Sequence, residues 1–325
     1  MNKKKCPYCG SSITKRNGTR NGVQLYKCQA CGRQFRAGEK LSDEHLWYLY
    51  LERKQTIAEI AQDYGVSDST IKRQLRRICV EWKQPDLHGM SGFVHLDATY
   101  WGHNWGVLLA LDEATTRPLY VAFIKSERTE DYSLAVKTIE DNGYQIQGVI
   151  LDGKISVFNA LSQYHRQMCQ FHMKQIIVRK LTKHPKIKAS MALLQLINEL
   201  SKLTYNQFQR AYDDLQIEYA DTIKRRSTAK DGSTHYTHRK LRGAMKSINT
   251  FLPYLFTYQR SDCVGMPNTN NKIEGVFTDL SKNLNNHSGL IEENRKRFIN
   301  GFFLALENKS ANQNSSETEP TAATL

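Results

Sequence analysis

The fold is decided by the stretch Gly92-Phe-Val-His-Leu-Asp-Ala-Thr-Tyr100 together with a second apolar run, Gly148-Val-Ile-Leu-Asp152. Both runs are rich in apolar and β-branched residues, which favours strands. Asp97 lies inside the first run, and Asp152 closes the second. A charge among apolar neighbours in a strand is costly unless something pairs with it, and a metal ion does so. The two aspartates therefore predict a metal site on an α/β domain.

The residues around these runs predict three antiparallel strands, a helix, a strand and a helix, which is the ribonuclease-H-like order. Turn-like residues from Asp112 to Pro118 connect the second and third strands. We interpret Asp112 as a turn residue, because a strand rather than a helix follows it. The predicted elements are strands Phe93–Tyr100, Trp105–Leu111, Leu119–Ile124, Gln147–Leu151 and Gln167–Phe171, and helices over residues 130–143, 154–164 and 271–284.

Two Cys-x-x-Cys pairs lie near the N-terminus, and each is followed by glycine. The four cysteines are Cys6, Cys9, Cys28 and Cys31. Thiolates in two such knuckles close a tetrahedral zinc site that can hold a small domain with almost no core. Two redox dithiols are the alternative, but the paired spacing favours structural zinc. Residues 1–38 are therefore predicted to form a zinc ribbon.

Residues 39–88 predict a helix-turn-helix DNA-binding domain. A helix that starts at the cap Ser42 is followed by a second apolar stripe, a turn at Gly65, and a further helix capped by Ser67. The outward face of this last helix is basic and is the expected DNA-binding surface, made of Lys72, Arg73, Arg76 and Arg77. A helical hairpin that does not bind DNA is the alternative, which this basic face disfavours.

The charge of the chain points to a polyanionic partner. Lys plus Arg number 46 against 32 Asp plus Glu, for a formal net charge of +14. Residues 1–40 carry ten basic residues and one acidic residue, and residues 171–250 carry sixteen and six. Two separated basic blocks indicate that a polyanion is contacted at two places, and with the helix-turn-helix we expect this partner to be double-stranded DNA.

No apolar segment predicts secretion or membrane insertion. The basic start, Met1-Asn-Lys-Lys-Lys5, lacks a following apolar region. No run approaches the roughly 20 apolar residues of a membrane span. Cysteines in a reducing compartment bind metal more often than they form disulfides. We therefore expect a cytoplasmic, nucleoid-associated protein with no membrane partner.

A third carboxylate, Glu274, lies in the first turn of a predicted helix. It follows Asp152 by 274 − 152 = 122 residues, so a helical insertion must return the chain to the site. Asn270 or Asn271 would cap this helix and help to orient metal or phosphate. An ordinary favourable glutamate in a first helical turn is the alternative.

These residues carry a resemblance to a known family. The matching pieces are Leu96-Asp97-Ala-Thr, Asp152-Gly153, Cys169-Gln-Phe-His172 and Asn271-x-x-Glu274, and they span residues 5–305 together with the N-terminal modules. In this order they resemble bacterial insertion-sequence transposases of the Mutator-like DDE superfamily, in a variant with an N-terminal zinc ribbon. The resemblance implies that Asp97, Asp152 and Glu274 form a catalytic triad, with Asn271 in a supporting role. The family pattern includes Cys169 and His172 but leaves their chemistry open. We expect a supporting, local structural role for this pair beside the active site, and the alternative is a metal site completed by Cys263 or a nearby histidine.

The family implies a DNA transposase that binds the terminal inverted repeats of its own element. It would cut strands by metal-dependent hydrolysis and join 3′-hydroxyl ends to target DNA. Zinc would be structural, and Mg²⁺ or Mn²⁺ catalytic. A homodimer or larger assembly is expected, because two element ends must be paired. The alternatives are a DNA-binding regulator with an inactive core, which the intact triad disfavours, and a nuclease without strand transfer, which the DNA-binding module disfavours.

The expected architecture is multidomain α/β. Its segments are a zinc ribbon (1–38), a helix-turn-helix domain (39–88), the first part of a ribonuclease-H-like core (89–178), an all-helical insertion (179–257), the last part of the core (258–307) and a disordered tail (308–325).

Overall fold

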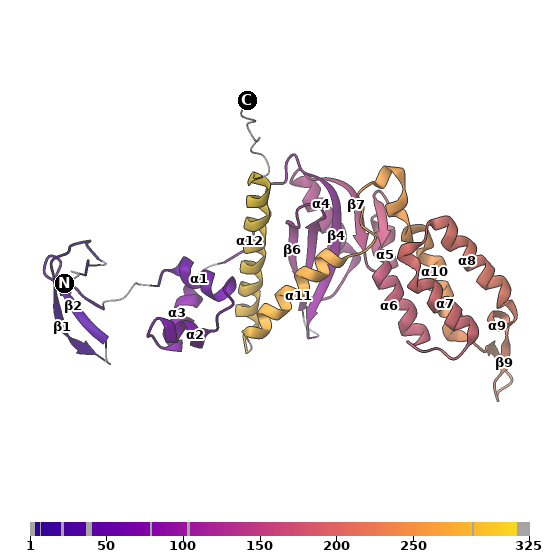
Figure 1. The fold of residues 1–325 in the computed structure, drawn as a ribbon, viewed down its shortest axis with the longest axis horizontal. Helices are drawn as coiled ribbons and strands as arrows, with labels where there is room; N and C mark the ends of the chain where they lie inside the picture. Colours follow the sequence, from indigo (N-terminus) through magenta and orange to yellow (C-terminus); the bar gives the residue numbers. More distant parts are fainter. Residues whose placement is uncertain are drawn as a thin grey trace, which may run out of the picture. The chain divides into compact units, whose positions relative to one another are not determined.

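The chain divides into two compact units in the computed structural model. The first unit comprises residues 1–79 and 286–294, and the second comprises residues 80–285 and 295–325. The structure describes residues 4–6, 8–20, 23–36, 41–78, 80–102, 105–287 and 289–316 (Figure 1). Among these residues, no helix is both long and apolar enough to cross a membrane.

The first unit begins with a small antiparallel sheet in the order β1-β2-β3, formed by β1 (Thr14–Arg20), β2 (Val23–Cys28) and β3 (Gln34–Arg36). Its buried residues are Cys6, Cys28 and Phe35, with Tyr26 stacked on Phe35 at a centroid distance of 5.9 Å. A core this small buries too little apolar surface to stabilise a domain unaided.

Three short helices follow in the same unit: α1 (Asp43–Leu51), α2 (Ile57–Asp63) and α3 (Asp68–Arg77). The predicted turn residue Gly65 adopts a φ of +60°, which glycine tolerates without strain. The predicted cap Ser67 accepts a hydrogen bond from the backbone N–H of Thr70 at 3.3 Å. Ile71 and Leu75 are buried on one face of α3, so the basic residues of this helix lie on the exposed face.

The second unit is built on a mixed five-stranded sheet in the order β6-β5-β4-β7-β8. The strands are β4 (Ser91–Trp101), β5 (Trp105–Asp112), β6 (Pro118–Ile124), β7 (Gln145–Leu151) and β8 (His165–Met168). The first three form the predicted antiparallel meander, and β7 pairs with β4 in parallel, as β8 does with β7. Helices α4 (Thr129–Asp141) and α5 (Ile155–Ala160) make the two crossovers.

The two faces of the sheet have different neighbours. Val94 and Leu96 belong to the main core, which includes the buried stripe of α4. Phe93 and Ile150 belong to a smaller cluster with Cys263 and Met266. Because side chains alternate along a strand, Asp97 shares the face of Phe93, not the face that α4 covers.

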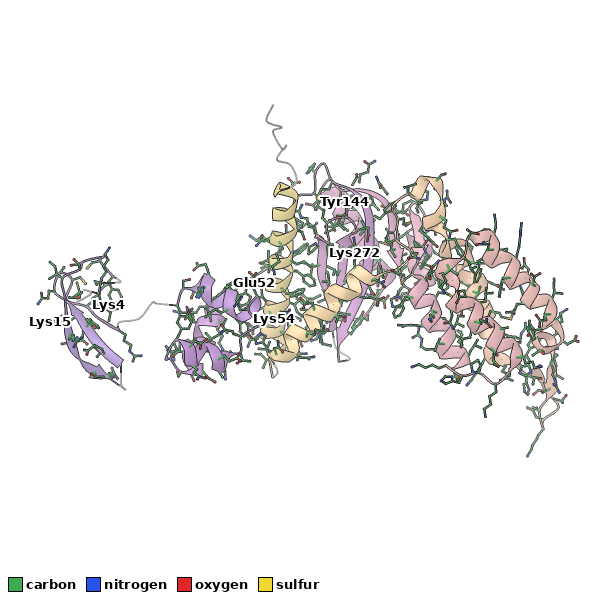
Figure 2. The ribbon with its side chains drawn as sticks, viewed as in Figure 1. Lys4, Lys15, Glu52, Lys54, Tyr144 and Lys272 are labelled. Carbon is green, nitrogen blue, oxygen red and sulfur yellow. The ribbon has the colours of Figure 1, made fainter. Side chains whose placement is uncertain are left out.

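Asp112 holds the predicted turn between β5 and β6. Its Oδ2 accepts hydrogen bonds from the backbone N–H and the hydroxyl of Thr115, at 2.7 and 2.6 Å. Its Oδ1 accepts the hydroxyl of the buried Tyr144, which Figure 2 labels. The carboxylate is only 2% exposed, so Asp112 also anchors the start of β7.

The chain between β8 and Leu255 forms a helical lobe beside the β8 edge (Figure 1). Its helices are α6 (Gln170–Leu181), α7 (Lys188–Asn198), α8 (Tyr205–Glu218), α9 (Ala220–Lys224) and α10 (Arg239–Leu255), with a 3₁₀ turn at Leu200–Lys202. Buried residues of α6, α7, α8 and α10 are continuous with the main core.

The prediction that the insertion is all-helical was wrong. A two-stranded antiparallel hairpin, β9 (Arg226–Thr228) and β10 (Thr234–Tyr236), separates α9 from α10. The turn at Asp231-Gly232 closes it, since Gly232 adopts a φ of +82° and Asp231 accepts the N–H of Ser233 at 2.9 Å. Turn chemistry of this kind supports a hairpin as well as a break between helices.

Two further boundaries differ from expectation. The predicted strand Gln167–Phe171 is β8, which ends at Met168, and α6 begins at Gln170. Along α6 the buried residues recur at helical spacing, at Met173, Ile177 and Leu181. This spacing explains why α6 begins within the predicted strand.

The end of the chain is also more helical than predicted. Two short 3₁₀ turns, Thr257–Gln259 and Ser261–Cys263, lead to α11 (Asn271–Asn286), and α12 (Glu292–Ser316) follows. Residues 308–316 are therefore helical rather than disordered, and no proline between Glu292 and Ser316 interrupts the helix. The remainder of the predicted tail lies outside the described residues.

Candidate functional site

Asp97 lies in the middle of β4, where the strand is paired with β5. Its Oδ1 accepts a hydrogen bond from the backbone N–H of Ala98 at 2.8 Å. Burial, together with the charges of Asp152, Glu274 and Glu127, raises the pKa of Asp97 to about 8, although the hydrogen bond from Ala98 opposes this shift. The carboxyl therefore belongs to an acidic cluster whose members repel one another.

Asp152 follows the last residue of β7 and lies next to Asp97. The register pairs Val94 with Val149 and His95 with Ile150, an offset of 150 − 95 = 55 residues. The same offset takes Asp97 to Asp152, and neighbouring strands lie about 4.8 Å apart. Burial is the largest cause that raises the pKa of Asp152, and the charge of Glu127 adds to it.

Glu274 reaches the cluster from the first turn of α11, the helix that lies over the strands in Figure 1. Its backbone N–H donates to the carbonyl oxygen of Asn270 at 3.1 Å, which closes the first helical turn. Its Oε1 lies 3.6 Å from Nδ1 of His172. The charge of Glu274 is one of the causes that raise the pKa of Asp97, so the three predicted carboxylates share one region.

A buried polar chain clamps the start of α11 to the sheet. His95 is fully buried two residues before Asp97, with Nδ1 2.6 Å from Oδ1 of Asn270 and Nε2 2.5 Å from Oε2 of Glu113. Lys272, labelled at the start of α11 in Figure 2, lies 2.9 Å from Oε1 of Glu113 and also donates to its carbonyl oxygen. These contacts fix the helix that carries Glu274.

Asn270 rather than Asn271 occupies the buried position beside the site. Asn270 is fully buried, and its backbone N–H donates to Sγ of Cys169 at 3.2 Å. Asn271 is exposed at the first position of α11. The sequence left both residues as candidates, because either one could cap the helix.

Cys169 and His172 lie against Glu274. Sγ of Cys169, a ring nitrogen of His172 and a carboxylate oxygen of Glu274 all lie within 4.8 Å of one another. Burial raises the pKa of the Cys169 thiol to about 11, although the backbone N–H groups of His172 and Asn270 oppose this shift.

Sequence reasoning missed Glu127, the fourth carboxylate of the cluster. Glu127 accepts a hydrogen bond from the hydroxyl of Tyr132 at 2.9 Å, and Nζ of Lys154 lies 3.7 Å from its Oε1. Because β6 and β7 both run parallel to β4, the residues that follow them emerge at the same edge of the sheet. A strand-end rule applied to β6 as well as β7 would have singled out Glu127.

The donor set fits divalent cations. Burial and the charges of neighbouring carboxylates raise the pKa of both Asp97 and Asp152. Each of these costs is relieved when a cation sits among the carboxylates. Carboxylate oxygens are the donors that Mg²⁺ and Mn²⁺ prefer.

The four N-terminal cysteines form a second, separate cluster. Sγ of Cys6 lies 3.7 Å from that of Cys31, and Sγ of Cys9 lies 3.6 Å from that of Cys28. The N–H of Gly10 donates to Cys6 and that of Gly32 to Cys28, and both glycines adopt a φ of +72°. The two knuckles are therefore equivalent, and four thiols within 4.8 Å are compatible with a zinc site.

The four basic residues predicted to bind DNA, Lys72, Arg73, Arg76 and Arg77, are all exposed on α3. They lie opposite the buried Ile71 and Leu75. A continuous basic surface on one helix face can approach a phosphate backbone or a groove.

Two solved structures show a remote similarity to the chain. No family model and no curated protein matches the chain. A chain of the Drosophila P element transposase strand transfer complex shows 8% identity and a TM-score of 0.31, covering 86% of this chain and 81% of that chain. A chain of the simian T-cell lymphotropic virus intasome in complex with PP2A regulatory subunit B56 gamma shows 11% identity and a TM-score of 0.21, covering 61% and 72%. Neither score establishes a shared fold, so the site is interpreted from its own geometry.

Proposed function

We propose that the chain is a DDE transposase with a ribonuclease-H-like core formed by residues 89–178 and 258–307. The observation that carries this proposal is the convergence of Asp97, Asp152 and Glu274 from β4, the end of β7 and α11. The strand order, with an antiparallel meander followed by two parallel strands, supports the same core.

The three carboxylates would hold Mg²⁺ or Mn²⁺ in this site. When bound, such ions activate a water or a DNA 3′-hydroxyl and stabilise the leaving oxygen. The chain itself holds the ligands in place: the register of β4 and β7 fixes the two aspartates, and the His95 clamp fixes α11. Glu127 engages Nζ of Lys154, which keeps a cation beside the acidic cluster where DNA phosphates must approach.

DNA recognition is divided between two surfaces in this proposal. The exposed basic side chains of α3 would read the terminal inverted repeats, since a helix of this kind can reach base edges. The basic block of residues 171–250 would add affinity for the phosphate backbone, which is strongly salt-dependent. A homodimer or larger assembly in the nucleoid would pair two element ends.

Catalysis is tested with DNA that carries the inverted repeats flanking the gene. The wild-type chain should nick these ends and join the 3′-hydroxyl to target DNA, and Asp97→Asn should do neither while binding the ends normally. Asp141→Asn is the matched control: it removes an exposed carboxylate at the far end of α4, about 18 Å along the helix from Thr129. Cleavage without joining would indicate a nuclease, and specific binding without cleavage would indicate a regulator.

Recognition is tested in the full chain by two charge-matched sets of alanine substitutions. Replacing Lys72, Arg73, Arg76 and Arg77 should abolish the preference for element ends over other DNA. Replacing the exposed Arg179, Lys183, Lys186 and Lys188 of the insertion should weaken binding to all DNA equally. A preference for the ends that survives the first set would show that α3 does not read them.

A further inference from the structure

A three-residue cluster with a chemistry of its own lies where the first turns of α6 and α11 meet. Cys169 precedes α6, His172 lies in its first turn, and Glu274 lies in the first turn of α11. Their ligand atoms all lie within 4.8 Å of one another. The first turns of two separate helices thus bring a sulfur, a nitrogen and an oxygen ligand atom close together.

The distance between the nitrogen and oxygen donors matches metal coordination better than hydrogen bonding. Nδ1 of His172 lies 3.6 Å from Oε1 of Glu274, which is too long for a hydrogen bond. In a tetrahedral complex with metal–ligand bonds of about 2.0–2.1 Å, two ligand atoms lie about 3.3 Å apart. A small inward movement would bring both atoms into contact with one ion.

Two of the three donors are buried without any hydrogen-bond partner. Nδ1 of His172 and Oε1 of Glu274 are both inaccessible to solvent and unpaired, although the two side chains are 23% and 31% exposed overall. An unpaired buried polar atom costs about 1–3 kcal/mol, and two that face each other are rare in a folded protein. Sγ of the fully buried Cys169 accepts the N–H of Asn270, a contact common to metal-bound thiolates.

We propose that Cys169, His172 and Glu274 bind a borderline-soft divalent ion, Zn²⁺ or one of similar chemistry. A thiolate and an imidazole select zinc over Mg²⁺, which prefers oxygen ligands. Binding displaces the thiol proton of Cys169 to solvent. Only Oε1 of Glu274 is needed, so its second carboxylate oxygen stays available to the acidic cluster. The inference goes beyond the proposed function, because this ion would tie α6 to α11 and position Glu274.

A second cluster of the same size does not qualify. His165, Asp262 and Cys263 also bring their ligand atoms within 4.8 Å of one another. The carboxylate of Asp262, however, already accepts two hydrogen bonds from Arg260, at 2.9 and 2.8 Å. This guanidinium holds the pKa of Asp262 well below its usual range and occupies the oxygens that a metal would need.

The site is tested by the zinc content of the full-length chain, measured by atomic emission. We expect about two zinc ions per wild-type chain, one in the four-cysteine cluster and one here. Cys169→Ser should lower this to about one, and so should Cys9→Ser, which removes the other ion. Cys263→Ser is the matched control, a buried cysteine beside the same sheet, and it should leave the content unchanged.

Cobalt substitution identifies the ligands independently. A difference spectrum between the wild type and Cys169→Ser should show a thiolate-to-cobalt band from a single sulfur. If Cys169→Ser does not fold, His172→Asn can be used to test the same site, because His172 is partly exposed. One zinc per wild-type chain, or equal zinc in the wild type and both variants, overturns the proposal.

The outcome is separable from that for catalysis. Asp97→Asn should retain both zinc ions while it loses cleavage. A wild type with one zinc and normal cleavage would overturn this site alone. A wild type with two zinc ions and no cleavage would overturn the proposed function alone.

Discussion

The four-cysteine cluster and the carboxylate cluster are assembled in opposite ways. All four thiols come from residues 6–31, and two equivalent knuckles bring them together. The carboxylates come from β4, the end of β7 and α11, and 122 residues separate the last two along the chain. The first site is local and has almost no core to support it, whereas the second rests on a large continuous core.

The two clusters therefore differ in how far the fold depends on the metal. A domain without a core needs its ion to fold at all. A site mounted on a sheet and a packed helix is already formed when the ion arrives, so its ion supplies chemistry rather than stability.

The largest effect is expected for removal of metal from the first unit. Chelation, or Cys9→Ser, should unfold residues 4–36, because structural zinc contributes about 10–16 kcal/mol in domains of this kind. Amide NMR signals of the β1–β3 sheet should collapse, while those of the five-stranded sheet stay dispersed. A folded ribbon without metal would show that Tyr26, Phe35 and their neighbours suffice.

Glu274→Gln should have the next largest effect, and it should fall mainly on activity. Loss of one metal-binding carboxylate removes several kcal/mol of transition-state stabilisation, so strand cleavage should fall by more than about 100-fold. DNA affinity should stay near wild type, and the melting temperature should fall by no more than it does in Cys169→Ser, because Oε1 lacks a hydrogen bond and its inferred partner is the zinc ion. Loss of cleavage accompanied by unfolding would place Glu274 in the scaffold instead.

His95→Ala should have a mixed effect. It leaves Asn270 without its ring partner in a fully buried position, which should lower the free energy of unfolding by about 1–3 kcal/mol. Because α11 is then less firmly held, half-maximal cleavage should need about 10-fold more Mg²⁺. Urea denaturation and Mg²⁺ titration measure the two effects, and excess Mg²⁺ should rescue cleavage. No rescue would mean that His95 acts only on stability.

The smallest effect concerns pH and the first unit. Burial lowers the pKa of His287 below 6.5, and its Nε2 donates to the carbonyl oxygen of Tyr50 at 3.0 Å. The contribution of neutral His287 to the free energy of unfolding is complete above pH 6.5. It is lost as the pH falls toward the pKa of His287 in the folded state, because the unfolded state then binds the proton more readily. The melting temperature of this unit should fall below pH 6.5, and His287→Gln should flatten that dependence. An unchanged profile in the variant would remove His287 as the cause.

Much of the second unit could be predicted because its signals are short-range. Apolar runs mark β4, β5 and β6, and the helical stripe of α4 lies where expected. The hairpin of β9 and β10 and the helical end of α12 could not be predicted in this way. Their residues are polar, so no hydrophobic period distinguishes helix, hairpin and disorder.

By itself, the sequence determined the local features of this protein: the cysteine knuckles, the caps Ser42 and Ser67, and the carboxylates that interrupt apolar strands. Each is set by residues a few positions apart, so spacing alone reveals it. Only the tertiary structure decided that the 55-residue offset of β4 and β7 puts Asp97 beside Asp152. It also brought Glu127, His95 and the Cys169–His172 pair to the same place. Those contacts depend on strand register and on the packing of α11, which are collective results of the whole core and leave no signature in any one segment.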